Sequence, residues 1–125
     1  MTGDWLAILA AVTAIGAALI AGVFFTFSSF VMPALAKIPP GQGIAAMQSI
    51  NVVVLRSAFM PVFLGTTLLC LAVAVLAGGD WMLLAGSLSY LLGCFGLTGR
   101  FNVPLNHRLA RVMPDSDAGA ALWAQ

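Results

Sequence analysis

The side chains with the most useful chemistry are amides in two separate segments. Asn102 and Asn106 are four residues apart, and Gln48 and Asn51 are three residues apart. If both segments are helical, each pair lies on one side of its helix. A carboxamide offers both donors and an acceptor, so Asn102 and Asn106 can hold a carbonyl, a phenol or each other. We expect this polar stripe to face the segment that carries Gln48 and Asn51.

One cation and one imidazole flank the second amide pair. Arg100 precedes it, and His107 follows Asn106 directly. Histidine is the commonest general base, but nothing in the sequence orients the ring of His107. The residues leave an alternative open, because polar side chains at a helix end often meet only water and lipid headgroups.

Metal and disulfide chemistry have little support in the sequence. Cys70 and Cys94 are the only cysteines, they form no Cys-x-x-Cys motif, and the single histidine is too little for a metal cage. Counted from the predicted turn at residues 78–80, the two thiols differ in depth by about 6 Å, which is awkward for a disulfide. We therefore expect no metal site and two buried structural thiols.

The elements that position these side chains follow from the composition. The chain has 125 residues, of which 62% are hydrophobic and 7% charged, whereas about 25% are charged in a typical soluble domain. No charged residue or histidine occurs in the ranges 5–32, 57–79 and 81–99. About 20 apolar residues suffice for a helix to cross a bilayer, and none of the ranges alternates as a lipid-facing strand would. The sequence predicts an all-α integral membrane helical bundle with three transmembrane helices.

The connections set the expected topology. We treat residues 1–125 as a single membrane domain with an inner loop at 33–56 and an inner C-terminal segment at 100–125. All five basic residues lie in these two segments, namely Lys37, Arg56, Arg100, Arg108 and Arg111. Positive charge accumulates on the cytoplasmic side, so we expect a multi-pass protein of the cell (inner) membrane with its N-terminus outside. The acidic start at Asp4 argues against a signal peptide.

Several local predictions accompany this topology. Asp80 is expected to cap the third helix, with Trp5 and Trp81 at the outer interface. The sequence Pro33-Ala-Leu-Ala-Lys-Ile-Pro-Pro-Gly41 is expected to end the first helix, and a helix after Gly43 to run on into the second span with a bend at Pro61. Two small-residue faces are expected to pack against other helices: Ala14, Ala18 and Gly22, and Gly86, Ser89, Gly93 and Gly96. Small residues are common in membrane helices, which leaves chance as the alternative.

Three elements in order resemble the anthrone oxygenase-like family of small membrane proteins from bacteria and fungi. They are Gly22-Val-Phe-Phe-Thr-Phe-Ser-Ser-Phe-Val-Met-Pro-Ala-Leu35, Ala46-Met-Gln-Ser-Ile-Asn51 and Phe101-Asn-Val-Pro-Leu-Asn106. Trp123 is similar to a tryptophan that precedes the last helix of the family. The resemblance spans nearly the whole chain, and the Asn-Val-Pro-Leu-Asn element is its most specific part.

The resemblance implies a four-helix membrane bundle and, as in characterised fungal members, a monooxygenase that converts an anthrone to an anthraquinone without metal or flavin. The implied substrate is a lipophilic, polycyclic or quinone-like aromatic, and no cofactor is expected. Carried onto this chain, Gln48, Asn51, Asn102 and Asn106 would bind substrate oxygens. Arg100 would stabilise the enolate and His107 would act as the base.

The sequence departs from the family at its end. It stops at Gln125, where the family continues into a fourth spanning helix. We expect either a truncated chain or a bundle completed by another copy or another subunit. Besides the enzyme, a non-catalytic accessory or binding subunit of a larger membrane complex therefore stays open. A transporter is less favoured, because no acidic residue lies within a span. The expected surroundings are the lipid bilayer, not a nucleic acid.

Overall fold

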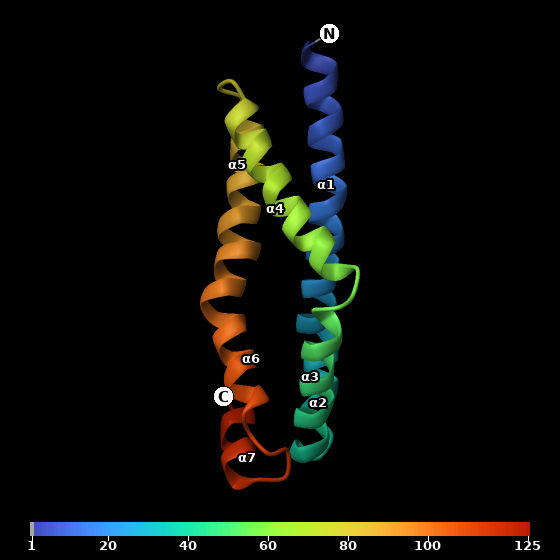
Figure 1. Cartoon of the computed structure of the whole chain (residues 1–125), viewed down its shortest axis with the longest axis vertical. Coiled ribbons are helices and arrows are strands. Elements are labelled where there is room, and N and C mark those ends of the chain that lie inside the picture. Colours follow the sequence, from blue (N-terminus) through green and yellow to red (C-terminus); the bar gives the residue numbers. More distant parts are fainter. Residues whose placement is uncertain (1) are drawn as a thin grey trace.

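Residues 2–54 form one long helix followed by a shorter one that returns beside its end. The computed structural model describes residues 2–125. α1 (Thr2–Thr26) continues through a π-helical segment, η1 (Phe27–Val31), into α2 (Met32–Leu35). α3 (Pro40–Val54) then runs back alongside α2 (Figure 1). The inner loop expected from the sequence is therefore a helical hairpin.

The rest of the chain contains a second antiparallel hairpin and a short terminal helix. α4 (Phe59–Leu76) crosses α1 and leads to a tight turn in which Gly78 and Gly79 have positive φ angles of 59° and 92°. The third long helix descends through α5 (Trp81–Ser89), η2 (Tyr90–Gly96), η3 (Thr98–Asn102) and α6 (Val103–Ala110). α7 (Asp117–Trp123) folds back at its lower end (Figure 1).

The predicted fold class is confirmed. The regular structure of residues 2–125 is entirely helical. Three helical stretches are long and apolar enough to cross a membrane, namely Gly3–Leu35, Phe59–Leu76 and Trp81–Ala110. The third stretch continues well past residue 99. The Asn-Val-Pro-Leu-Asn segment is therefore helical and part of the same continuous helix as the third span.

The Asp80 cap is also confirmed. The carboxylate oxygen Oδ1 of Asp80 accepts hydrogen bonds from the backbone amides of Met82 at 3.0 Å and Leu83 at 3.3 Å. Two of the amides that lack a partner at the start of α5 are thereby satisfied. This fixes where the third long helix begins.

The predicted continuous helix from Gly43 into the second span is wrong. α3 ends at Val54 and α4 begins at Phe59. The hydroxyl of Ser57 stabilises the break, because it donates to the carbonyl of Val54 at 2.9 Å and accepts from the amide of Phe59 at 3.2 Å. Pro61 lies in the first turn of α4, where its missing N–H leaves no hydrogen bond unmade.

Two prolines lie inside long helices, each just after a π-helical segment. Pro33 follows η1 and Pro104 follows η3. A proline ring clashes with the carbonyl four residues earlier and cannot donate to it, and a wider turn before the ring relieves both problems. The first helix therefore continues through Pro33 to Leu35, a few residues beyond its predicted end.

The predicted small-residue packing faces are wrong as contacts within the described chain. Ala14, Ala18 and Gly22 are exposed, and a Cβ added to Gly22, Gly86 or Gly93 would have no neighbour within 4 Å. The close approach of α1 to α4 occurs instead at Gly16, where an added Cβ would collide with the hydroxyl of Thr66. Gly16 lies on the opposite side of α1 from the predicted stripe.

Candidate functional site

Gln48 joins the two helices that carry the predicted polar residues. Its side-chain nitrogen Nε2 donates to the carbonyl oxygen of Leu109 at 2.8 Å and to that of Val112 at 2.9 Å. Carbonyls at the end of a helix lack intrahelical partners. The Leu109 carbonyl also accepts from the amide of Val112 at 3.3 Å. Gln48 adds a second donor to it and supplies a donor to the Val112 carbonyl, and so fixes the end of α6 against α3. Both of its amide hydrogens are used, so only its carbonyl oxygen is free to meet a ligand.

These two hydrogen bonds from Gln48, which we call the Gln48 clasp, set the register of α3 and α6. The two helices run in opposite directions (Figure 1). Asn51 lies one turn above Gln48 on α3, and Asn106 lies one turn above Leu109 on α6. A turn rises about 5.4 Å in both helices, so the antiparallel register brings Asn51 level with Asn106. Both side chains are half-buried.

Asn51 has a donor without a partner. Its side-chain nitrogen Nδ2 is buried and makes no hydrogen bond to any group within residues 2–125. A buried amide hydrogen without an acceptor costs about 1–3 kcal/mol. A ligand or a water molecule that supplies an acceptor at this position removes that cost. Asn51 is therefore the side chain that most directly indicates a binding site.

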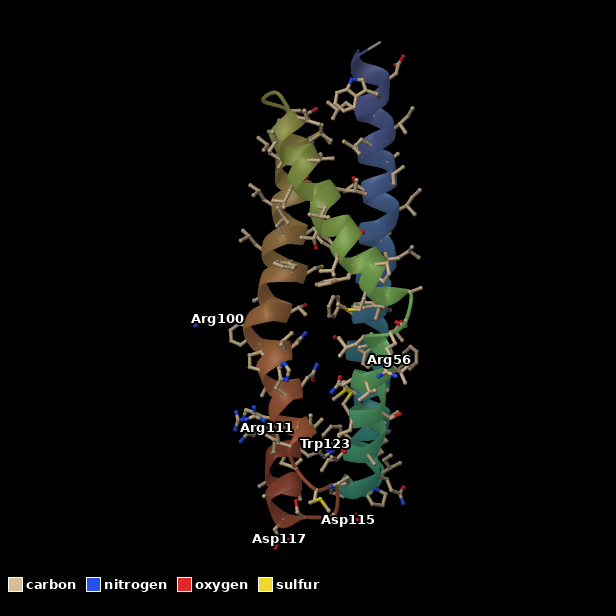
Figure 2. The ribbon with its side chains drawn as sticks, viewed as in Figure 1. Arg56, Arg100, Arg111, Asp115, Asp117 and Trp123 are labelled. Atoms are coloured by element: carbon tan, nitrogen blue, oxygen red, sulfur yellow. The ribbon has the colours of Figure 1, made fainter. Side chains whose placement is uncertain are left out.

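The other predicted site residues lie at different distances from this level. Asn102 lies one turn above Asn106 on the same face and is exposed, and His107 is exposed beside Asn106. Arg100 is exposed too, and its guanidinium carbon lies 5.7 Å from the ring centroid of Phe101. Figure 2 shows Arg100 pointing away from α2 and α3. The structure thus places Asn51 and Asn106 at the same level, with Gln48 below them, and directs Arg100 elsewhere.

α7 closes the lower side of this region. The indole of Trp123 points toward α3 (Figure 2) and packs so closely on it that a Cβ added to Gly43 would lie 3.0 Å from the ring carbon Cζ2. Ser116 caps α7 by accepting from the amide of Gly119 at 2.9 Å. From the sequence, Trp123 stands out only because it is similar to a tryptophan of the family. Gly43 makes room for the indole ring, but a glycine by itself does not indicate which residue packs against it.

Above the polar level lies an aromatic cluster that the sequence reasoning missed. The ring of Phe63 stacks on Phe59 at 5.6 Å and on Phe95 at 5.9 Å between centroids. The hydroxyl of Tyr90 donates to the carbonyl of Phe63 at 3.0 Å. Phe24 meets Phe59 edge-on at 6.5 Å. These rings come from three separate helices, so their spacing in the sequence does not reveal the cluster. Flat apolar walls of this kind suit planar aromatic ligands.

A groove of about 320 Å³ lies in the other half of the bundle. Its lining comes from α1, α4, α5 and η2 and includes the small residues Ala10, Ala14, Ala17 and Gly86. The three side chains in it that carry hydroxyls are Thr13, Ser87 and Tyr90. Two of these hydroxyls are engaged within the chain, because Thr13 donates to the carbonyl of Leu9 at 2.7 Å and Tyr90 to Phe63. The groove is therefore mainly a space between apolar helices.

The comparisons with known proteins decide the family. A family model, Anthrone oxygenase, matches residues 51–125. The chain belongs to this family. The anthrone oxygenase match begins at Asn51 and contains Asn102, Asn106, Arg100 and His107, while Gln48 and the first span lie outside it. No curated protein and no solved structure matches the chain. Residues 2–125 hold no group of three or more His, Cys, Asp or Glu side chains placed to bind a metal.

Proposed function

We propose that this protein oxidises a lipophilic, anthrone-like polycyclic substrate with molecular oxygen, at a site between α3 and α6 at the level of Asn51 and Asn106. The observation that carries the proposal is the buried, unpartnered amide nitrogen of Asn51, which lies at the start of the range matched by the family model. A substrate carbonyl is the acceptor that would satisfy it.

The reaction is balanced with oxygen as the only co-reactant. A base removes a proton from the methylene carbon of the anthrone, and the negative charge spreads to the carbonyl oxygen across the ring. The carbanion carbon then forms a bond to O2. Cleavage of the O–O bond leaves one oxygen atom as the new carbonyl, and the other leaves as water together with the two methylene hydrogens. The protein has to stabilise the enolate oxygen and accept one proton.

The amides fit the first of these tasks. Nδ2 of Asn51 and the amide of Asn106 can donate to the enolate oxygen, and preorganised donors become most effective as charge develops on it. Asn102 is one turn nearer the aromatic cluster and suits a second substrate oxygen. Arg100 points away from this level in Figure 2, so in this arrangement charge stabilisation rests on the amides.

Proton removal is assigned to His107. It follows Asn106 directly and is the only imidazole in the chain. An exposed histidine exchanges protons readily with water, so it can return the proton after each turnover. The rings of Phe59 and Phe95 lie on the membrane side of the amides and offer apolar surface to the polycyclic part of the substrate.

The site is assigned to the cytoplasmic side of the cell membrane. All five basic residues lie in the half of the molecule that contains α2, α3, the α3–α4 break, η3 and the α6–α7 turn, whereas Asp4 and Asp80 lie in the other half. With basic residues inside, the N-terminus is outside. A lipophilic substrate dissolved in the bilayer then reaches the amides from the inner leaflet.

A second function is favoured by a separate observation. The exposed small residues of α1 and α5 and the groove of about 320 Å³ between these helices form a surface that other transmembrane helices can approach closely. This suits an accessory subunit in a membrane complex or a homo-oligomer. An isolated monomer that turns over substrate would exclude the purely accessory function.

The test is oxygen consumption by the purified full-length protein in lipid nanodiscs with anthrone as substrate. We expect uptake of one O2 for each anthraquinone formed, unaffected by a metal chelator. Protein-independent oxidation is subtracted with empty nanodiscs. Absence of protein-dependent uptake would overturn the enzyme proposal and favour the accessory function.

A further inference from the structure

The third long helix carries an arginine face at its lower end. Arg100, Arg108 and Arg111 are all exposed. Arg100 and Arg111 are eleven residues apart, about three helical turns, and therefore point to the same side. Figure 2 shows both directed away from α2 and α3. None of the three forms an ion pair within 4.0 Å in the part of the chain that the structure describes.

Arg108 and Arg111 also line a shallow, open groove between α6 and α7. Its volume is about 480 Å³, and its other lining residues are Val112, Ala118, Ala121, Leu122 and Gln125. The groove therefore has two guanidinium groups at one wall and small or apolar side chains along α7. A ligand that matches both parts carries a phosphate next to an apolar portion.

The depth of the groove matches a lipid headgroup. From Trp81, at the outer end of the helix, to Arg108 there are 27 residues (108 − 81), or about 40 Å along the axis at 1.5 Å per residue. A bilayer including both headgroup layers is about 40–45 Å thick. If Trp81 lies in the outer headgroup layer, Arg108 reaches the inner one.

We propose that the α6–α7 groove binds the phosphate of an anionic phospholipid from the adjacent leaflet. Arg108 and Arg111 donate to the phosphate oxygens, because the planar guanidinium matches phosphate in geometry and charge. Ala118, Ala121 and Leu122 contact the glycerol and the first acyl carbons. This site is separate from the amides of the proposed enzyme and does not depend on any catalytic activity.

The lipid is tested by thermal unfolding of the full-length protein in a neutral detergent. Phosphatidylglycerol is titrated against phosphatidylcholine with the same acyl chains. Binding to the folded state raises the midpoint of unfolding, so we expect a saturable rise with phosphatidylglycerol that is much smaller with phosphatidylcholine. Equal rises with both lipids would overturn the proposal.

Paired variants separate the groove from net charge. R108Q/R111Q removes two positive charges at the groove, and K37Q/R56Q removes two elsewhere on the same side of the molecule. One arginine near an anionic lipid surface contributes about fivefold in affinity, so the loss for R108Q/R111Q is roughly 25-fold. K37Q/R56Q should retain most of the wild-type affinity. An equal loss in both variants would show a general charge effect and refute the site.

Two further measurements complete the test. Ala121→Phe fills the groove without changing charge and should abolish the lipid-dependent rise, which gives a result even if R108Q/R111Q does not fold. Unaltered lipid dependence in Ala121→Phe would contradict the groove. Glycerol 3-phosphate, which carries a phosphate on glycerol but no acyl chains, should give no rise at matched concentration. If it raises the midpoint as phosphatidylglycerol does, the ligand is a soluble phosphate and the lipid assignment is wrong.

Discussion

The side-chain nitrogen of Gln48 lies 2.8 Å from the carbonyl oxygen of Leu109, and this contact joins α3 to the end of α6. Gln48 and Leu109 are 61 residues apart in the sequence. One turn above this contact, on the two facing helices, lie the half-buried side chains of Asn51 and Asn106. The clasp thus determines which amides share a level, and the proposed chemistry depends on that register.

Replacing Gln48 should destabilise the protein. Gln48→Leu removes the hydrogen bonds to the carbonyls of Leu109 and Val112; the Leu109 carbonyl keeps the Val112 amide as a donor, and an unsatisfied group in a partly buried position costs about 1–2 kcal/mol. We expect a lower midpoint of thermal unfolding in detergent. Gln42→Leu, which alters an exposed amide on the same helix, is the control and should change the midpoint little. Equal midpoints for both variants would contradict the role of the clasp.

The crossing of α1 and α4 should depend on Gly16 and not on Gly22. A side chain at Gly16 collides with Thr66, whereas one at Gly22 meets nothing within 4 Å. Gly16→Val should therefore lower the unfolding midpoint strongly, by the overpacking cost of about 1–3 kcal/mol or more. Gly22→Val carries the same β-branched residue into the same helix and controls for helix propensity. A larger effect at Gly22 would show that its exposed face is an interface with another molecule.

Loss of the Asp80 cap should have a moderate effect. Asp80→Ala removes the acceptor for the amides of Met82 and Leu83 and is expected to cost about 1 kcal/mol. Asp80→Asn retains a capping oxygen and should recover most of that stability. The comparison is made by thermal unfolding at constant lipid content. An Asp80→Asn variant as unstable as Asp80→Ala would point to the charge and not to the cap.

The orientation is tested by labelling single introduced cysteines in intact cells with a membrane-impermeant thiol reagent. Gly3→Cys, near the exposed N-terminal end, should react. Ile38→Cys, in the turn between α2 and α3, should react only after the cells are opened. Both positions are accessible to solvent on the protein itself, so protection reports the membrane. The reverse pattern would invert the topology and place the amides outside.

The sequence predicts what depends on local chemistry. Charge-free ranges give the three long helices, since any helix that crosses lipid must be apolar over that length. The cap at Asp80 follows from one residue before a helix start. The contact between Trp123 and Gly43 could not be predicted from the sequence, because it exists only when α7 folds back on α3. The same holds for Gln48, whose role as a helix clasp depends on a register that no local pattern encodes.

The small residues show why packing was predicted incorrectly. Ala14, Ala18 and Gly22 form a regular stripe, yet they are exposed in the chain. A small side chain permits close approach, but it does not specify which helix approaches. Helical spacing could place Asn102 with Asn106 and Gln48 with Asn51, but not Asn51 at the level of Asn106, because that depends on how α3 and α6 pack. It could not give the direction of Arg100, which depends on the phase of the helix after the π-helical segments.

The most direct test of the proposed function is the rate of anthrone-dependent oxygen uptake by Asn51→Leu, measured together with its thermal unfolding. Leucine has a similar volume and removes a buried donor that has no partner, so stability should be unchanged or higher. The rate should fall on the order of 100-fold, as for other lost donors to a developing oxyanion, while Gln42→Leu retains wild-type activity. A stable Asn51→Leu protein that consumes oxygen at the wild-type rate would contradict the site proposed here.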